Sequence, residues 1–221
     1  MTVRQMLLFQ VNEVQGFLGD SINLAAAVRG GFASSADANQ TLVADIDQLV
    51  RLLAEIQISF ADLTILLNNE PKELVGKIPA DNFNFVSTNL EKIIEHLSKN
   101  LPKREVPVLK RGNSLAIALF KLQNLVWAAK MFFDEEKSSF SASEKTALKD
   151  IGKFLETIEN FFFTAGRWIN LLVNQKEYLW IEPKKPGEAQ TTAPAQGQAQ
   201  TIQTPKPTGT PTPPTVGQTN R

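Results

Sequence analysis

Cysteine is absent from this 221-residue chain, and histidine occurs once, at His96. Thiolate nucleophiles, cysteine zinc sites and multi-histidine metal sites therefore cannot be assembled from its residues. No disulfide can form, so the folded state depends on the burial of apolar side chains, for which the chain is long enough. We expect neither a metal nor another cofactor.

An excess of charge of one sign is also absent, because 23 basic residues balance 23 acidic ones. Four of the basic residues and one of the acidic residues lie from Pro183 onward, which leaves 19 basic and 22 acidic residues in the rest of the chain. A mildly acidic protein lacks the basic footprint on which nucleic-acid binding depends. We therefore expect no nucleic-acid partner.

Long uncharged runs and short catalytic motifs are missing as well. Glu13 and Asp20 interrupt the apolar stretch that a signal peptide would need, and no window of 18 residues is free of charge. The fingerprints G-x-G-x-x-G, G-x-x-x-x-G-K-[ST] and G-x-S-x-G do not occur. These absences predict a cytoplasmic protein that is not an enzyme and has no catalytic residues.

The composition changes near residue 182. Every Phe, Trp and Tyr lies at or before Trp180, whereas eight of the twelve prolines lie from Pro183 onward. The later segment, rich in Thr, Pro and Gln, cannot bury enough apolar surface to offset the ordering of its backbone. We expect a helical domain over residues 1–182 and a disordered tail over residues 183–221.

Apolar residues recur at helical spacing in two long stretches. The first spans residues 41–67, with alternating steps of four and three at Leu42, Ile46, Leu49, Leu53, Ile56, Phe60, Leu63 and Leu67. The second spans residues 143–179, with Ser141 and Glu144 as a capping box at its start. Each helix would expose an apolar stripe several turns long if it stood alone, so we expect the two to pack antiparallel.

Three further helices, two of them shorter, complete the pattern. One is predicted from a capping box of Thr88 and Glu91 up to residue 101, and another from Asn113 or Ser114 to about residue 133. A third spans residues 3–29 and is expected to stop at the following glycine pair, residues 30–31. The predicted fold is an all-α, antiparallel bundle of four to six helices.

The second long helix carries more aromatic side chains than one core face can hold. Phe161, Phe162 and Phe163 are consecutive, and successive residues of a helix point about 100° apart. Burial by several neighbouring helices is favoured, and a surface offered to a partner or a membrane is the alternative. The proposed contact residues of such a surface are Phe154, Phe161, Phe163 and Trp168.

A basic cluster lies between the third and fourth predicted helices. A solvated loop is the favoured interpretation, because no aromatic residues are interleaved with the charges. The alternative is contact with phosphate groups of nucleic acid or lipid. The candidate anion contacts are Lys103, Arg104, Lys110 and Arg111.

Carboxylates near His96 and along the long helices are the remaining candidates for chemistry. Glu95 precedes His96 and Glu91 lies one turn earlier, so an imidazole and a carboxylate could share a helix face. No nucleophile motif flanks them, which favours a surface histidine. The acidic pairs, Asp45 with Asp47 and Glu156 with Glu159, are expected on solvated or partner-selecting helix faces.

Together these patterns predict a non-enzymatic structural or adaptor protein that acts through helix packing. Such a protein would self-associate or be a subunit of a larger assembly, with a protein partner. The main alternative is a membrane-surface bundle whose N-terminal or Phe-rich helix engages lipid. A third, weaker interpretation is an enzyme without a recognisable motif, or a small-ligand pocket inside the bundle.

Overall fold

The computed structural model describes residues 1–34, 40–68, 80–103, 108, 110–139, 148–175 and 177. These ranges contain five α-helices: α1 (Val3–Ala33), α2 (Gln40–Asn68), α4 (Ala80–Lys99), α5 (Ser114–Glu136) and α7 (Lys149–Leu172). A short 3-10 helix, η1 (Lys137–Ser139), follows α5. The predicted all-α bundle is confirmed. Its helices lie within one compact unit, Met1–Ile181, while the predicted tail, residues 183–221, falls outside the described residues.

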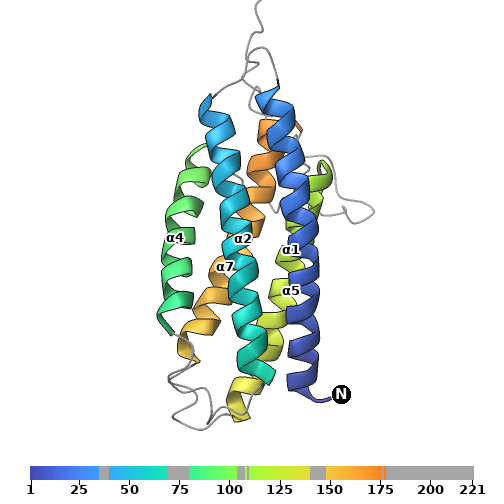
Figure 1. The fold of residues 1–221 in the computed structure, drawn as a ribbon, viewed down its shortest axis with the longest axis vertical. Helices are drawn as coiled ribbons and strands as arrows, with labels where there is room; N and C mark the ends of the chain where they lie inside the picture. Colours follow the sequence, from blue (N-terminus) through green and yellow to red (C-terminus); the bar gives the residue numbers. More distant parts are fainter. Residues whose placement is uncertain are drawn as a thin grey trace, which may run out of the picture. The chain divides into compact units, whose positions relative to one another are not determined.

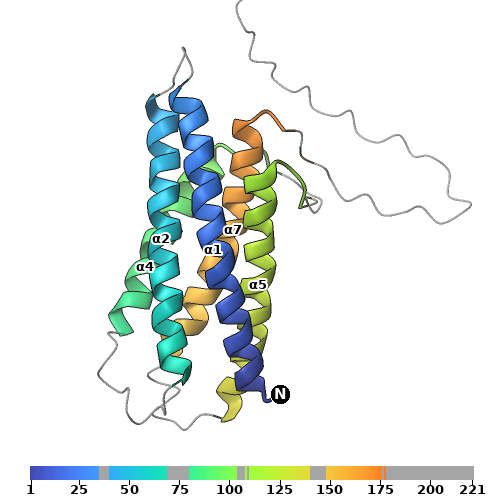
Figure 2. The same ribbon diagram turned by 45° about the vertical axis from the view of Figure 1, so that its right-hand side comes forward.

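The helices lie side by side along a common axis, and consecutive helices run in opposite directions (Figures 1 and 2). α1 packs against α2 and α5, and α7 packs against α5 and α4. In contrast, α2 and α4 touch at few points. The five helices therefore form a ring that is closed everywhere except between α2 and α4.

The core of the bundle is built from the predicted apolar stripes. On α2, every predicted stripe position from Ile46 to Leu67 is buried, while Leu42 is partly buried. The ring of Phe60 on α2 lies 5.7 Å from that of Phe154 on α7, and Phe83 of α4 meets Phe154 edge-on at 4.9 Å. Aromatic pairs prefer such tilted arrangements. The two long helices, α2 and α7, are antiparallel as predicted (Figure 1). Their main packing partners are other helices, however: α1 for α2, and α4 and α5 for α7.

Two predicted helix starts have different outcomes. Asn113 is the N-cap of α5, and its side chain accepts a hydrogen bond from the backbone N–H of Ala116, as predicted. Thr88 is not an N-cap, because α4 already begins at Ala80 and the Thr88 hydroxyl donates to the carbonyl of Asn84 one turn earlier. The predicted capping box of Ser141 and Glu144 falls outside the described residues.

Two predicted helix ends are wrong. α1 continues through Gly30 and Gly31 to Ala33, so the glycine pair does not stop it. A helical glycine costs only about 1 kcal/mol relative to Ala, which the packing of α1 against two neighbouring helices offsets. α7 ends at Leu172, well before residue 179, and Asn174 follows with a left-handed φ of 53°.

One described stretch, Ser114–Ser139, is long and apolar enough to cross a membrane by length and composition alone. Many apolar side chains of α5 are nevertheless in the core of the bundle, among them Leu119, Phe120 and Phe133. The core helix of a water-soluble protein passes the same test. The helix therefore does not argue for a membrane protein, and the cytoplasmic location stays a prediction.

Candidate functional site: the groove between α2 and α4

The open side of the ring forms a groove of about 510 Å³ between α2 and α4. Its floor is apolar and is made by Leu52 of α2 and Ile93 of α4. Pockets that bind small molecules have volumes of about 300–1,000 Å³ and combine an apolar lining with a few polar groups. The residues that line the groove are Ala44, Asp47, Gln48, Arg51, Leu52, Glu55, Asn89, Lys92 and Ile93.

Two cations line opposite walls of this groove, Arg51 on α2 and Lys92 on α4. Neither forms an ion pair with another described residue. Glu55, one turn from Arg51, also lines the groove, and the amides of Gln48 and Asn89 add neutral hydrogen-bonding groups. The groove thus offers two uncommitted positive charges above an apolar floor.

Three of the four carboxylates closest in sequence to these cations are held by other residues, and the fourth, Glu55, has no ion pair with a described residue. Asp47 accepts hydrogen bonds from Arg29 of α1 at 2.8 and 3.3 Å. Glu91 pairs with Lys153 of α7 at 3.1 Å, and Glu95 pairs with Lys99 at 3.1 Å. Because Asp47, Glu91 and Glu95 are held by these partners, Arg51 and Lys92 remain available to an anion in the groove, where Glu55 is the nearest carboxylate to Arg51 that is not engaged.

A second, much smaller space of about 10 Å³ adjoins the groove. The two share Gln48, Leu52 and Ile93 as lining residues. The smaller cavity is also lined by side chains from α2, α4 and α7, namely Asp45, Leu49, His96, Leu97, Phe161 and Trp168. In it, the Nε2 atom of His96 lies 3.9 Å from the Oδ1 atom of Asp45.

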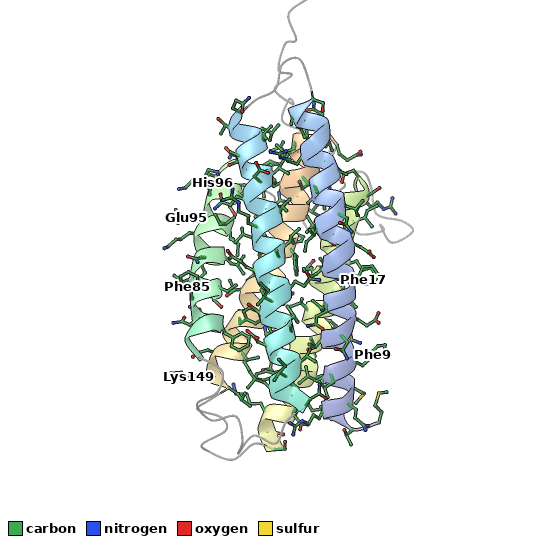
Figure 3. The ribbon with its side chains drawn as sticks, viewed as in Figure 1. Phe9, Phe17, Phe85, Glu95, His96 and Lys149 are labelled. Atoms are coloured by element: carbon green, nitrogen blue, oxygen red, sulfur yellow. The ribbon has the colours of Figure 1, made fainter. Side chains whose placement is uncertain are left out.

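The favoured interpretation of His96 as a surface histidine agrees with its side chain, which is 55% exposed, whereas the alternative pairing with Glu91 or Glu95 is not found. Figure 3 shows His96 and its neighbour Glu95 near the end of α4, but Glu95 and Glu91 are engaged by lysines. The carboxylate beside His96 comes instead from α2, because α2 and α4 run in opposite directions and bring residues 45 and 96 to the same end of the bundle. Within the described ranges, no three acidic or histidine side chains lie close enough to hold a metal ion.

The aromatic residues proposed as a partner-binding surface lie mainly in the core. Phe154 and Phe161 are fully buried, Trp168 is 3% exposed, and Phe163 is partly buried against the core and against the ring of Phe120, 6.1 Å away. Their burial follows from the position of α7, which packs against both α4 and α5. Phe154, Phe161 and Trp168 therefore hold the bundle together, while Phe163 keeps part of its side chain at the surface.

The candidate anion contacts do not converge on one site. The Lys110 ammonium donates to the side-chain oxygen of Asn124 on α5, and burial lowers the pKa of this amine, while the nearby Glu159 carboxylate opposes the shift. Arg111 contributes its backbone carbonyl, which accepts a hydrogen bond from the Asn170 amide. Lys103 is described but makes no recorded polar contact, and Arg104 lies outside the described residues.

Comparison with known proteins identifies the fold through solved structures. No protein-family model and no curated protein matches the chain. Three structures of variants of a PduO-type ATP:corrinoid adenosyltransferase from Lactobacillus reuteri match it with TM-scores of 0.52, 0.53 and 0.54. They are 17–18% identical in sequence, and the alignments cover 81–83% of this chain and 86–88% of theirs. Two are complexed with cobalamin and ATP, and the third with ATP.

These matches correct the functional expectation. The proteins that share this bundle architecture are enzymes, so the inference from missing motifs to a non-enzymatic structural or adaptor protein is wrong. The membrane-surface alternative is set aside with it. The motifs searched for in the sequence belong to strand–loop–helix folds, and their absence carries no information about an all-α bundle.

Proposed function

We propose that this chain is an enzyme that binds a nucleoside triphosphate in the groove between α2 and α4. The observation that carries the proposal is the pair of uncommitted cations, Arg51 and Lys92, on opposite walls. Phosphate groups are recognised by such cations, and the apolar floor of Leu52 and Ile93 suits the face of a base. The fold likeness to proteins complexed with ATP supports the choice of ligand.

The proposal is limited to the nucleotide and does not include a corrinoid. The groove has polar walls and a volume of about 510 Å³, which suit a nucleotide better than a large, flat macrocycle. The expected self-association of the chain also stays a prediction.

Isothermal titration calorimetry with ATP and with adenosine tests the proposal. Removing one charged hydrogen-bonding partner typically weakens binding about tenfold or more. We therefore expect Arg51→Gln and Lys92→Gln each to weaken ATP binding about tenfold, with little effect on adenosine. Lys99→Gln is the matched control, since Lys99 lies on the same helix, is paired with Glu95 and does not line the groove.

Salt provides a second readout of the same contact. Binding that depends on two exposed cations weakens as ionic strength rises, because the Debye length falls below about 10 Å above 0.1 M salt. The proposal is overturned if the wild-type protein binds ATP no more tightly than adenosine, or if Arg51→Gln and Lys92→Gln leave ATP binding unchanged.

A further inference from the structure

The small cavity beside the groove has the size and lining of a site for one water molecule. Its volume is about 10 Å³, and a cavity of about 10–15 Å³ on this measure holds a single water that needs two to four polar partners. Asp45, Gln48 and His96 are polar groups in its wall, and its other lining residues are apolar. The cavity therefore suits one ordered water on the α2–α4 side of the bundle.

The spacing between His96 and Asp45 fits the same water. Their closest atoms, Nε2 and Oδ1, are 3.9 Å apart, which is too far for a direct hydrogen bond. Two polar groups at that distance are commonly bridged by a water that bonds to both. With the imidazole proton on Nδ1, the water donates one hydrogen to Nε2 of His96 and the other to Oδ1 of Asp45, which leaves the lone pairs of its oxygen free.

We propose that this water is a nucleophile, that His96 is its general base, and that the chain hydrolyses the terminal phosphate of the nucleotide in the groove. The inference rests on the proposed function, because the substrate is the ligand proposed there. Gln48, Leu52 and Ile93 line both spaces, so a water in the cavity lies next to a ligand in the groove. Asp45 is the positioning residue, since it orients the water.

The reaction balances without a further reagent. The water oxygen forms a bond to the terminal phosphorus, and the bond from that phosphorus to its bridging oxygen breaks. The electron pair of the broken bond leaves with the nucleoside diphosphate, and a water proton moves to Nε2 of His96. Arg51 and Lys92 stabilise the negative charge of the phosphoryl group in transit. The His96 side chain is 55% exposed, so it can return its proton to solvent.

The same geometry predicts a pH dependence. A protonated imidazole has no lone pair at Nε2 and cannot accept the water proton, so hydrolysis falls as the solution is acidified. Asp45 faces the imidazole from α2, and α7 contributes only the uncharged rings of Phe161 and Trp168 to the cavity. On α4 itself, Lys92 and Lys99 lie within one turn of His96, and Glu95 is its neighbour in sequence.

The test measures phosphate release from the magnesium salt of ATP by the full chain, together with ATP binding by calorimetry. We expect His96→Gln to lower hydrolysis by about 10²–10⁴-fold, the usual contribution of a general base, while ATP binding stays within about twofold of wild type. Asp45→Asn should lower hydrolysis by a smaller factor. Lys99→Gln, on the same helix, should match the wild type, and the fall in rate on acidification should disappear in His96→Gln.

The outcomes separate this inference from the proposed function. A wild-type protein that binds ATP but releases no phosphate overturns the hydrolysis and leaves the binding proposal intact. Hydrolysis by His96→Gln at the wild-type rate, or a loss of activity explained by an equal loss of ATP binding, also overturns the role of His96. A wild-type protein that does not bind ATP overturns both.

Discussion

The ion pair between Arg167 of α7 and Glu177 allows a quantitative test of how the end of the bundle is held. Arg167 Nε lies 2.6 Å from one Glu177 oxygen, and its Nη2 lies 3.3 Å from the other and 2.8 Å from the carbonyl oxygen of Pro102. The two side chains are only 14% and 8% exposed. One guanidinium therefore joins α7, the segment after it and the segment after α4.

Replacement of Arg167 by Met leaves the Glu177 carboxylate largely buried without this cation. Removing one partner of a buried pair costs about 3–5 kcal/mol. The residual exposure of Glu177 and its further interaction favour the lower end, about 3 kcal/mol. In a chain of this length, that loss lowers Tm by roughly 6–12 °C. By comparison, Lys99→Met removes an exposed pair with Glu95 and should cost less than about 0.5 kcal/mol.

A double-mutant cycle in urea isolates the coupling between the two charges. Arg167→Met combined with Glu177→Gln removes both charges, so we expect a remaining loss of about 1 kcal/mol, mainly from the Pro102 carbonyl without its donor. The coupling energy is then about 2 kcal/mol plus whatever the single variant Glu177→Gln loses. If Arg167→Met costs less than about 1 kcal/mol, or if the double variant loses the sum of the single losses, the pair does not stabilise the fold in the way described.

Two other predictions concern packing and protonation. At Gly166, a Cβ atom would lie 2.7–3.0 Å from three ring atoms of Phe120, whereas at Gly16 it would meet nothing within 4 Å. Replacing a helical Gly by Ala gains about 1 kcal/mol, but overpacking costs about 1–3 kcal/mol. Thermal unfolding should therefore show that Gly16→Ala is stabilised and that Gly166→Ala is not. Burial lowers the pKa of Lys110 in the folded state below its value of 10.5 in the unfolded state. At alkaline pH just below 10.5, the unfolded state therefore binds more protons than the folded state. The contribution of Lys110 to the free energy of unfolding rises with pH through that window. NMR titration should show a further decrease of the Lys110 pKa in Glu159→Gln, which removes the opposing charge; an unchanged pKa would contradict this assignment.

The apolar stripes of the helices could be predicted from the sequence, but the groove between α2 and α4 could not. Arg51 has acidic residues four positions away on either side, Asp47 and Glu55, and a helix surface with that spacing predicts local ion pairs. The structure instead joins Asp47 to Arg29 of α1. Nothing in the local sequence indicates that exchange, so Arg51 did not stand out as a cation without an ion-pair partner.

The local sequence also failed to identify the partner of His96. Its sequence neighbours, Glu91 and Glu95, were the natural candidates for a carboxylate partner, but the residue beside it is Asp45, which lies in a different helix. The error at His96 came from seeking its carboxylate partner on α4 alone. By contrast, the expectation that several neighbouring helices bury the aromatic residues of α7 agrees with the burial of Phe161 and Phe162, because α7 packs against both α4 and α5.

The sequence by itself determined where the helices lie along the chain and which side of α2 and α5 faces inward. The reason is that apolar residues recur with the period of the helix, a pattern that is visible within one stretch of sequence. Only the tertiary structure decided that α4 docks on α7 and leaves a gap beside α2. That gap brings Arg51 towards Lys92 and Asp45 towards His96. Both pairs of residues depend on the order of the helices around the core. The periodicity of apolar residues within one helix does not encode that order.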